Sequence, residues 1–272
     1  MVSKNDDIVN FRNYQNVEES IKQNYFLCRK NQTIEYVRSM HKKYLTFDKE
    51  LTFDDIFNHL EKFIDISDPD ITLPNFYHGI QTAEGIRKDG HPDWLQVVGL
   101  IHDIGKIMFL KGCDEDGTTI KNQWGIVGDT FIVGCRIPDS VVYPEFNKEN
   151  PDMNNPIYNT KLGIYKEGCG LDKVLCSWGH DEFLYQILKF NKNILPKEAL
   201  YIIRYHSLYP YHKENEYKYF MNEKDKKMLQ WLKLFNQYDL YTKNNSKKIS
   251  SDTMIYYKNL IRKYFFGSKL AF

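Results

Sequence analysis

The chain has 272 residues, of which 42% are hydrophobic, and it is long enough to bury a sizeable core. It carries 37 lysines and arginines against 36 aspartates and glutamates, so a net charge of +1 gives no bulk electrostatic reason to expect nucleic acid or an anionic membrane as a partner. The five cysteines include no C-x-x-C pair, which argues against a disulfide framework or a zinc knuckle and favours reduced thiols in the cytoplasm.

The first ten residues are polar and are expected to form a flexible N-terminus before a single domain over residues 11–272. They lack the hydrophobic core of a signal peptide. No run in the chain approaches the ~18 apolar residues that a membrane span requires. We therefore expect a soluble, monomeric, cytoplasmic protein.

Six segments show the spacing of apolar residues that predicts helices. In the third, which begins near Pro92, apolar residues recur with the 3.6-residue period as far as Met108. The predicted helices lie within residues 31–44, 74–89, 91–110, 181–192, 196–209 and 225–243.

Residues 111–172 form a stretch of different composition, rich in Gly, Pro, Asn and Asp. Within it, residues 128–135 and 140–143 are typical of short β-strands. Irregular segments of this length in compact domains are usually functional or disordered. The expected fold is therefore mainly α, a helical bundle with a long irregular middle segment over one end and minor β-structure.

Four of the eight histidines fall inside or at the ends of predicted helices, and acids accompany them. The ordered set is His78, His102 with Asp103, His180, His206 and Asp239, and Asp181 directly follows His180 as Asp103 follows His102. Imidazole and carboxylate ligands suit iron, manganese or zinc, and the absence of cysteine favours the harder metals. Six ligands exceed the needs of one tetrahedral zinc but suit two metals that share a carboxylate. The pattern indicates a metal site in a helical bundle of the HD-domain type, a superfamily made up mostly of phosphohydrolases.

Lys106 lies four residues after His102 and three after Asp103, which places its ammonium on the same helix face as these side chains. A cation beside metal ions is electrostatically unfavourable unless it meets an anionic or polar substrate there. We therefore expect Lys106 to face a substrate.

Each member of the set also has a simpler interpretation. A single helical histidine is more often a core or surface residue than a ligand, and Asp239 with Lys243 has the spacing of an ordinary helical ion pair. Ser207 is compatible with a helix-terminal hydroxyl. The histidines without a comparable context are expected to be structural or solvated: His41, His59, His91 and His212.

Several long segments of the chain resemble the myo-inositol oxygenase family. They include DWLQVVGLIHDIGKIM, WGIVGDTFIVGC, SWGHDEFLYQILKFN, IIRYHSLYPYH and FNQYDLYTK, and the likeness runs from FRNY at Phe11 to the C-terminus. The resemblance implies a non-haem enzyme with a mixed-valent pair of iron ions. Such an enzyme uses dioxygen to cleave the ring of myo-inositol in a four-electron oxidation to D-glucuronate, the first step of inositol catabolism.

The same resemblance implies roles for individual residues. One iron is expected to bind His78, His102 and Asp239, and the other His180 and His206, with Asp103 bridging the two. Lys106 and Asp103 are the implied catalytic residues. The implied contacts to the inositol are Arg12, Asp65, Ile66, Ser67, Lys106, Gly128, Asp129, His206, Ser207 and Lys243.

Two other interpretations remain open at this stage. A phosphohydrolase of the HD superfamily would need a basic phosphate pocket, whereas Asp65 and Asp129 would repel phosphate. A catalytically silent metal-binding or scaffold protein would be expected to lack one of the six ligands, and all six are present.

The chain departs from the family pattern in three places, none of which is an implied ligand. Residues 111–124 are longer and more charged than expected, NFYH stands where Ser-Phe-His is more usual, and the chain ends in KLAF rather than in tryptophan. The conformation near residues 111–122 and the preference among inositol isomers are therefore less constrained.

Overall fold

The computed structural model describes residues 11–70, 72–267 and 269–272, so the expectation of a flexible segment at residues 1–10 lies outside the described residues. The α-helices are α1 (Glu19–Asn31), α2 (Ile34–Tyr44), α3 (Phe53–Leu60), α4 (Asn75–Lys88), α5 (Asp93–Ile101), α6 (His180–Phe190), α7 (Lys197–Tyr205), α8 (Tyr209–His212), α9 (Glu223–Tyr241) and α10 (Ser251–Tyr264). The 3₁₀ helices are η1 (Ile104–Lys111), η2 (Asp114–Asp116), η3 (Pro144–Glu149), η4 (Pro151–Asn154), η5 (Leu171–Lys173) and η6 (Lys218–Phe220). The strands are β1 (Glu50–Thr52) and β2 (Lys269–Ala271).

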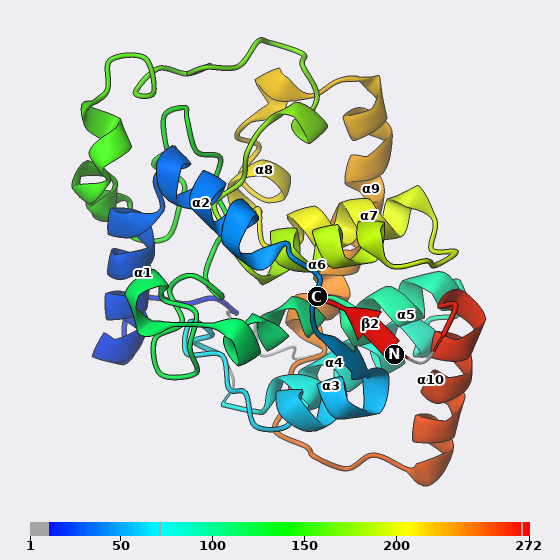
Figure 1. The fold of residues 1–272 in the computed structure, drawn as a ribbon. Coiled ribbons are helices and arrows are strands. Elements are labelled where there is room, and N and C mark those ends of the chain that lie inside the picture. Colours follow the sequence, from blue (N-terminus) through cyan, green and yellow to red (C-terminus); the bar gives the residue numbers. More distant parts are fainter. Residues whose placement is uncertain (1–10, 71, 268) are drawn as a thin grey trace, which may run out of the picture.

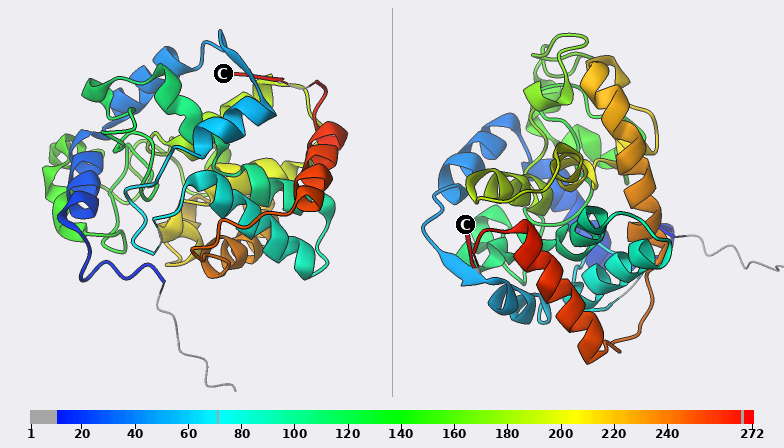
Figure 2. Two further views of the ribbon diagram at one scale, coloured as in Figure 1. Left: turned by 90° about the horizontal axis from the view of Figure 1, so that it is seen from below. Right: turned by 90° about the vertical axis from the view of Figure 1, so that its right-hand side faces the viewer.

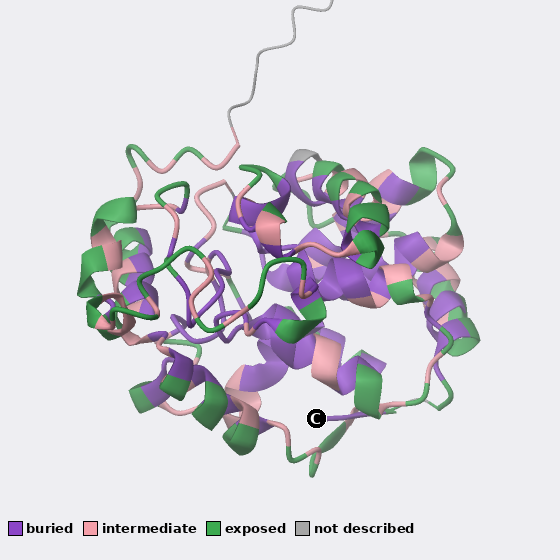
Figure 3. Cartoon of the chain, turned by 90° about the horizontal axis from the view of Figure 1, so that it is seen from above, coloured by how far each residue is buried: buried purple, intermediate pink, exposed green. Residues whose placement is uncertain are grey.

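Five helices form the centre of the molecule. Helix α4 packs on α5, α6 packs on α7, and α9 contacts α4, α5 and α7. Every residue of α5 from Leu95 to Ile101 is buried, as its nearly unbroken apolar sequence requires. Helices α1 and α10 lie at opposite ends of the molecule (Figures 1 and 2), and the buried residues concentrate on the central helices (Figure 3). The mainly helical fold expected from the sequence is confirmed.

The prediction of one continuous helix over residues 91–110 is wrong in its second half. Helix α5 ends at Ile101, and after His102 and Asp103 the chain continues as the tighter 3₁₀ helix η1. The backbone of Gly105 approaches α6 so closely that a Cβ there would overlap the carbonyl oxygen of His180. This close packing of η1 on α6 is a tertiary constraint, and the apolar period in the sequence does not record it.

The middle segment is irregular, as expected, but neither of its predicted strands forms. Residues 140–143 are turn and bend, and residues 128–135 make only the isolated bridge between Ile132 and Cys176. Residues 128–135 are largely apolar because they are buried, and their backbone amides donate to carbonyl groups of different segments. Thr130 N–H donates to Ser207 O and Val133 N–H to Leu175 O, so no neighbouring strand is needed to satisfy the backbone.

The sequence did not reveal the two strands or four of the α-helices that the described residues form. Strands β1 and β2 pair antiparallel with Leu51 opposite Leu270, which ties the C-terminus to the segment before α3. Helices α1, α3, α8 and α10 were not predicted, although Thr52 and Ser250 cap α3 and α10 through side-chain hydrogen bonds. None of the helices in the described part of the chain is both long and apolar enough to traverse a bilayer.

Candidate active site

The six histidines and aspartates singled out in the sequence come together between the central helices, and all are buried. They are His78 in α4, His102 and Asp103 between α5 and η1, His180 at the start of α6, His206 directly after α7, and Asp239 in α9. Their ligand atoms form two groups that have Asp103 in common, one with His78 and His102 and the other with His180 and His206.

The carboxylate of Asp103 lies between the two groups. Its Oδ1 is 3.1 Å from His180 Nε2 and 3.8 Å from His206 Nε2, whereas its Oδ2 is 3.5 Å from His102 Nε2. On the far side, Asp239 Oδ1 is 2.9 Å from His78 Nε2 and 3.3 Å from His102 Nε2. Asp103 is therefore placed to serve both groups at once.

Helix ends orient two of the imidazoles. His102 and His206 each directly follow the last residue of a helix, where the final carbonyl groups have no partner within the helix. Each ring folds back so that Nδ1 lies 2.9 Å from Gly99 O and 2.8 Å from Ile203 O, respectively. A carbonyl oxygen only accepts, so Nδ1 donates and the Nε2 lone pair is directed into the site.

His180 follows the same rule with a carbonyl from another segment, since its Nδ1 donates to Ile126 O at 2.8 Å. Its Nε2 then lies 3.1 Å from the Nε2 of His206. Two neutral imidazoles cannot share this contact, because both present lone pairs. The arrangement is favourable only with a cation or a proton between the two nitrogens, and this observation makes the residues fit a metal.

The two carboxylates of the cluster stay ionised. Burial by itself would raise the pKa of Asp103, but Lys106 and His102 nearby hold that pKa well below its usual range. Burial likewise opposes ionisation of Asp239, and hydrogen bonds with His102 and His78 hold its pKa well below its usual range. Anionic oxygen and neutral imidazole nitrogen suit iron, manganese or zinc, in agreement with the sequence-based expectation.

A cavity of about 650 Å³, including its opening to solvent, lies over this cluster. Nine of the expected substrate residues line it: Arg12, Asp65, Ser67, Lys106, Gly128, Asp129, His206, Ser207 and Lys243. Ile66 does not line it, because its side chain packs against the core.

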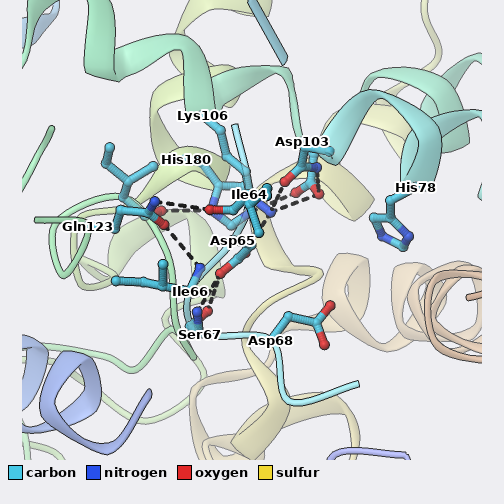
Figure 4. Close-up of polar contacts among 12 residues, drawn as sticks. Ile64, Asp65, Ile66, Ser67, Asp68, His78, Asp103, Lys106, Gln123 and His180 are labelled. Atoms are coloured by element: carbon cyan, nitrogen blue, oxygen red, sulfur yellow. Dashed lines mark hydrogen bonds and ion pairs between the residues drawn. The ribbon is translucent and has the colours of Figure 1, made fainter. Parts of the chain in front are cut away.

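Lys106 lies beside Asp103 and Asp65 (Figure 4) and lines the cavity. Its Nζ donates to Asp65 Oδ2 at 2.7 Å, to Asn75 Oδ1 at 2.8 Å and to Asp103 Oδ2 at 2.9 Å. The last contact arises because residues three apart eclipse in a 3₁₀ helix. Burial would lower the pKa of Lys106, but Asp103 and Asp65 raise it, so the side chain stays cationic. The ammonium therefore contacts a candidate metal ligand directly and does not face only a substrate.

Two amide side chains that the sequence did not single out hold this part of the site. The side chain of Asn75 donates to Asp103 and accepts from Lys106, and its only sequence signal is its place in NFYH beside His78. Gln123 is buried and spans the 64–66 segment: its Nε2 donates to Ile64 O at 3.0 Å and its Oε1 accepts from Ile66 N–H at 3.2 Å (Figure 4). No pattern in the sequence indicated that role.

At the rim, Asp129 pairs with a residue from the N-terminal segment. Arg12 Nη2 lies 2.8 Å and 2.6 Å from the two carboxylate oxygens, and the hydroxyl of Tyr25 donates to Oδ1 at 3.1 Å. The Arg12 guanidinium also lies 3.5 Å from the ring centroid of Tyr209. Tyr25 and Tyr209 were not expected from the sequence, because only the fold brings them to the cavity.

Lys243 does not form the helical ion pair with Asp239 that its spacing allowed. Helix α9 ends at Tyr241, and Lys243 Nζ lies 2.8 Å from Asp68 and 3.2 Å from Asp70. Burial lowers the pKa of Lys243, but the charges of Asp68, Asp239 and Asp70 raise it, with a net rise. His212, one of the histidines expected to be structural or solvated, is buried and donates through Nε2 to the carbonyl of His206 at 2.9 Å.

Known proteins resemble the chain over nearly its whole length. A family model described as myo-inositol oxygenase matches residues 18–272. A protein of Danio rerio named inositol oxygenase is 45% identical over 264 residues, which cover 95% of this chain and 92% of the relative. The inositol oxygenase of Homo sapiens is 44% identical over 95% of this chain and 90% of its own length. Inositol oxygenase 1 of Arabidopsis thaliana is 44% identical over 94% of this chain and 82% of its own length.

Proposed function

The chain belongs to the myo-inositol oxygenase family, and we propose that it catalyses the dioxygen-dependent cleavage of the ring of myo-inositol to D-glucuronate. The observation that carries the proposal is the family match over residues 18–272. It is supported by a cavity that is lined by Asp103, the residue shared by the two candidate ligand groups. We propose that residues 11–272 act as one catalytic domain. We also propose that the protein acts as a monomer. The five free cysteines support a reducing, cytoplasmic location.

Two iron ions are the proposed cofactors. His78, His102 and Asp239 would hold one, His180 and His206 the other, and Asp103 would bridge them. When bound, the metal ions would supply the Lewis acidity and the redox capacity that the oxidation of a polyol by dioxygen requires. The chain contributes the direction of the ligands, through the carbonyl groups that fix each imidazole, and a buried setting that limits access of water.

The other residues would bind and orient the polyol. A neutral cyclitol presents hydroxyl groups that need both donors and acceptors, and the cavity offers Lys106 and Lys243 as donors with Asp65 and Asp129 as acceptors. Lys106 stays protonated beside Asp103, and its three N–H groups already donate to Asp65, Asn75 and Asp103, so donation to a substrate oxygen would replace one of these bonds. A site that hydrogen-bonds each hydroxyl discriminates strongly against analogues that lack one.

The charges of the cavity disfavour the alternative of a phosphohydrolase. Within the described part of the chain, each cation that lines the cavity is already paired with a carboxylate: Arg12 with Asp129, Lys106 with Asp65 and Asp103, and Lys243 with Asp68 and Asp70. A phosphate would have to compete with these carboxylates, whereas a neutral polyol would not bring a further negative charge.

The test is an assay of the iron-loaded protein with myo-inositol in the presence and absence of dioxygen, with metal analysis of the same sample. The proposal expects one dioxygen consumed and one glucuronate formed per inositol, with no requirement for NAD(P)H. A need for an external reductant, or release of phosphate from a phosphorylated substrate with no oxidation of inositol, would contradict it.

A further inference from the structure

The second histidine–aspartate pair of the sequence behaves differently from the first. Asp181 follows His180 as Asp103 follows His102, yet its carboxylate is turned away from the metal cluster. Asp181 is 1% exposed; its Oδ2 accepts from the hydroxyl of Thr130 at 2.8 Å, and its Oδ1 accepts from the N–H of Glu182 at 3.1 Å. Burying a carboxylate is costly unless it is hydrogen-bonded, so the contact with Thr130 helps to keep the Asp181 side chain in this buried position.

Thr130 ends a short loop, residues 126–130, that is attached to α6 at both of its ends. At one end Ile126 O accepts from the backbone N–H of His180 at 2.9 Å and from its ring Nδ1 at 2.8 Å. At the other end Thr130 donates to Asp181. Between these two points lie Gly128, with a φ of 109°, and Asp129, both of which line the cavity.

A third contact ties Thr130 to the other histidine segment. Its backbone N–H donates to Ser207 O at 2.9 Å, and Ser207 directly follows His206. Thr130 is buried, so it links the residues that follow two candidate metal ligands and uses both of its donors to do so. The residue just before it, Asp129, is the one that holds Arg12 at the rim of the cavity.

We propose that Asp181 and Thr130 form a positioning pair that sets the affinity for the polyol by holding the carboxylate of Asp129 in place. This inference rests on the proposed function and deepens it. Neither residue lines the cavity or joins the metal groups of the described chain, so both act through Asp129. Loss of the hydroxyl contact would detach this end of the loop from α6 and leave Thr130 held by its backbone bond to Ser207, so that Asp129 together with Arg12 would shift. Misplacement of a binding group by about 1 Å can reduce catalysis by up to roughly a hundredfold.

The test compares Thr130→Val, which keeps the shape but removes the donor, with Thr130→Ser, which keeps the donor. Binding of myo-inositol to the iron-loaded protein is measured by calorimetry without dioxygen, so that no turnover occurs. We expect Thr130→Val to raise the Kd and the KM about tenfold, with iron per chain unchanged and kcat less affected than KM. Thr130→Ser should restore the Kd to within about twofold of the wild type.

Tyr257→Phe is the matched control, because it removes another largely buried hydroxyl hydrogen bond, to Glu84, outside the cavity. It should lower stability without raising the Kd. The inference is overturned if Thr130→Val binds inositol as the wild type does, if its Kd rises no more than that of the control at equal stability, or if its iron content falls in step with its binding. Failure of the wild type itself to bind or oxidise inositol would instead contradict the proposed function.

Discussion

Replacement of Lys106 by methionine removes a buried cation while nearly preserving the volume of the side chain. The ammonium lies 2.7 Å from Asp65 and 2.9 Å from Asp103, and it is 4% exposed. In the metal-free protein both carboxylates lose their partner. In the iron-loaded protein only Asp65 is left uncompensated, because the metal ions would neutralise Asp103.

The distances set the size of the effect. At an effective dielectric constant of about 20, each contact is worth roughly 6 kcal/mol of Coulomb energy before desolvation of the ammonium is subtracted. Removal of one partner of a buried pair typically lowers stability by about 3–5 kcal/mol. We expect Lys106→Met to lower the unfolding free energy of the metal-free protein by about this amount, and that of the iron-loaded protein by clearly less.

The assay is denaturant unfolding of both forms, with iron analysis and steady-state kinetics on the same preparations. Iron per chain should match the wild type, whereas kcat/KM should fall about a hundredfold, as for other lost donors to a reacting oxygen. Lys243→Met is the comparison, because Lys243 pairs directly with Asp68 and Asp70, which are not candidate ligands, and meets the candidate ligand Asp239 only at longer range. Its stability loss should differ less between the two forms than that of Lys106→Met. The reasoning is refuted if Lys106→Met loses iron, or if its stability loss is equal in both forms.

Three further changes test the site. Asp103→Ala removes the carboxylate that both ligand groups share, so both metal ions and all activity should be lost. If metal analysis finds one iron per chain in this variant, Asp103 does not bridge the two metal ions. The net effect of burial, Lys106 and Ser67 holds the pKa of Asp65 below its usual value of about 4. The ionised form of Asp65 therefore stabilises the protein fully above the unfolded-state pKa of about 4, and this stability is lost as the pH falls through the lower folded-state pKa. Asp65→Asn should make the free energy of unfolding depend less on pH between about pH 5 and pH 2. In Gly105→Ala the new methyl group would overlap the carbonyl of His180, so a stability loss of about 1–3 kcal/mol with weakened iron binding is expected, and a variant with wild-type melting and iron content would show that η1 and α6 are not tightly packed.

Much of the candidate site could be predicted because the residue types that bind metal ions can be recognised in short segments of the sequence. Histidine and aspartate at recurring helical positions indicated a shared metal cluster, and the fold brings all six together around Asp103. The expected cavity residues were also found at the cavity, with the exception of Ile66. Their roles toward iron and inositol stay predictions until the experiments above are done.

The roles of Asn75, Gln123, Tyr25 and Tyr209 could not be predicted, because no periodicity or ligand pattern marks a residue that supports another. Each acts through a partner far along the chain. Gln123, for example, holds Ile66 from 57 residues away, and Tyr25 donates to Asp129 across 104 residues. The same limit applies to Thr130 and Asp181, whose hydrogen bond joins residues 51 positions apart.

By itself the sequence determined the helical class of the fold, the set of residues able to bind metal ions and the likeness to one family, because periodicity and ligand chemistry are properties of short segments. Only the tertiary structure decided where the helix before Asp103 ends, that residues 128–135 are core rather than strand, and which acid each lysine meets. Lys106 pairs with an acid 41 residues away and Lys243 with one 175 residues away. Such pairings depend on the packing of distant elements, since a buried charge takes whichever partner the fold brings within reach.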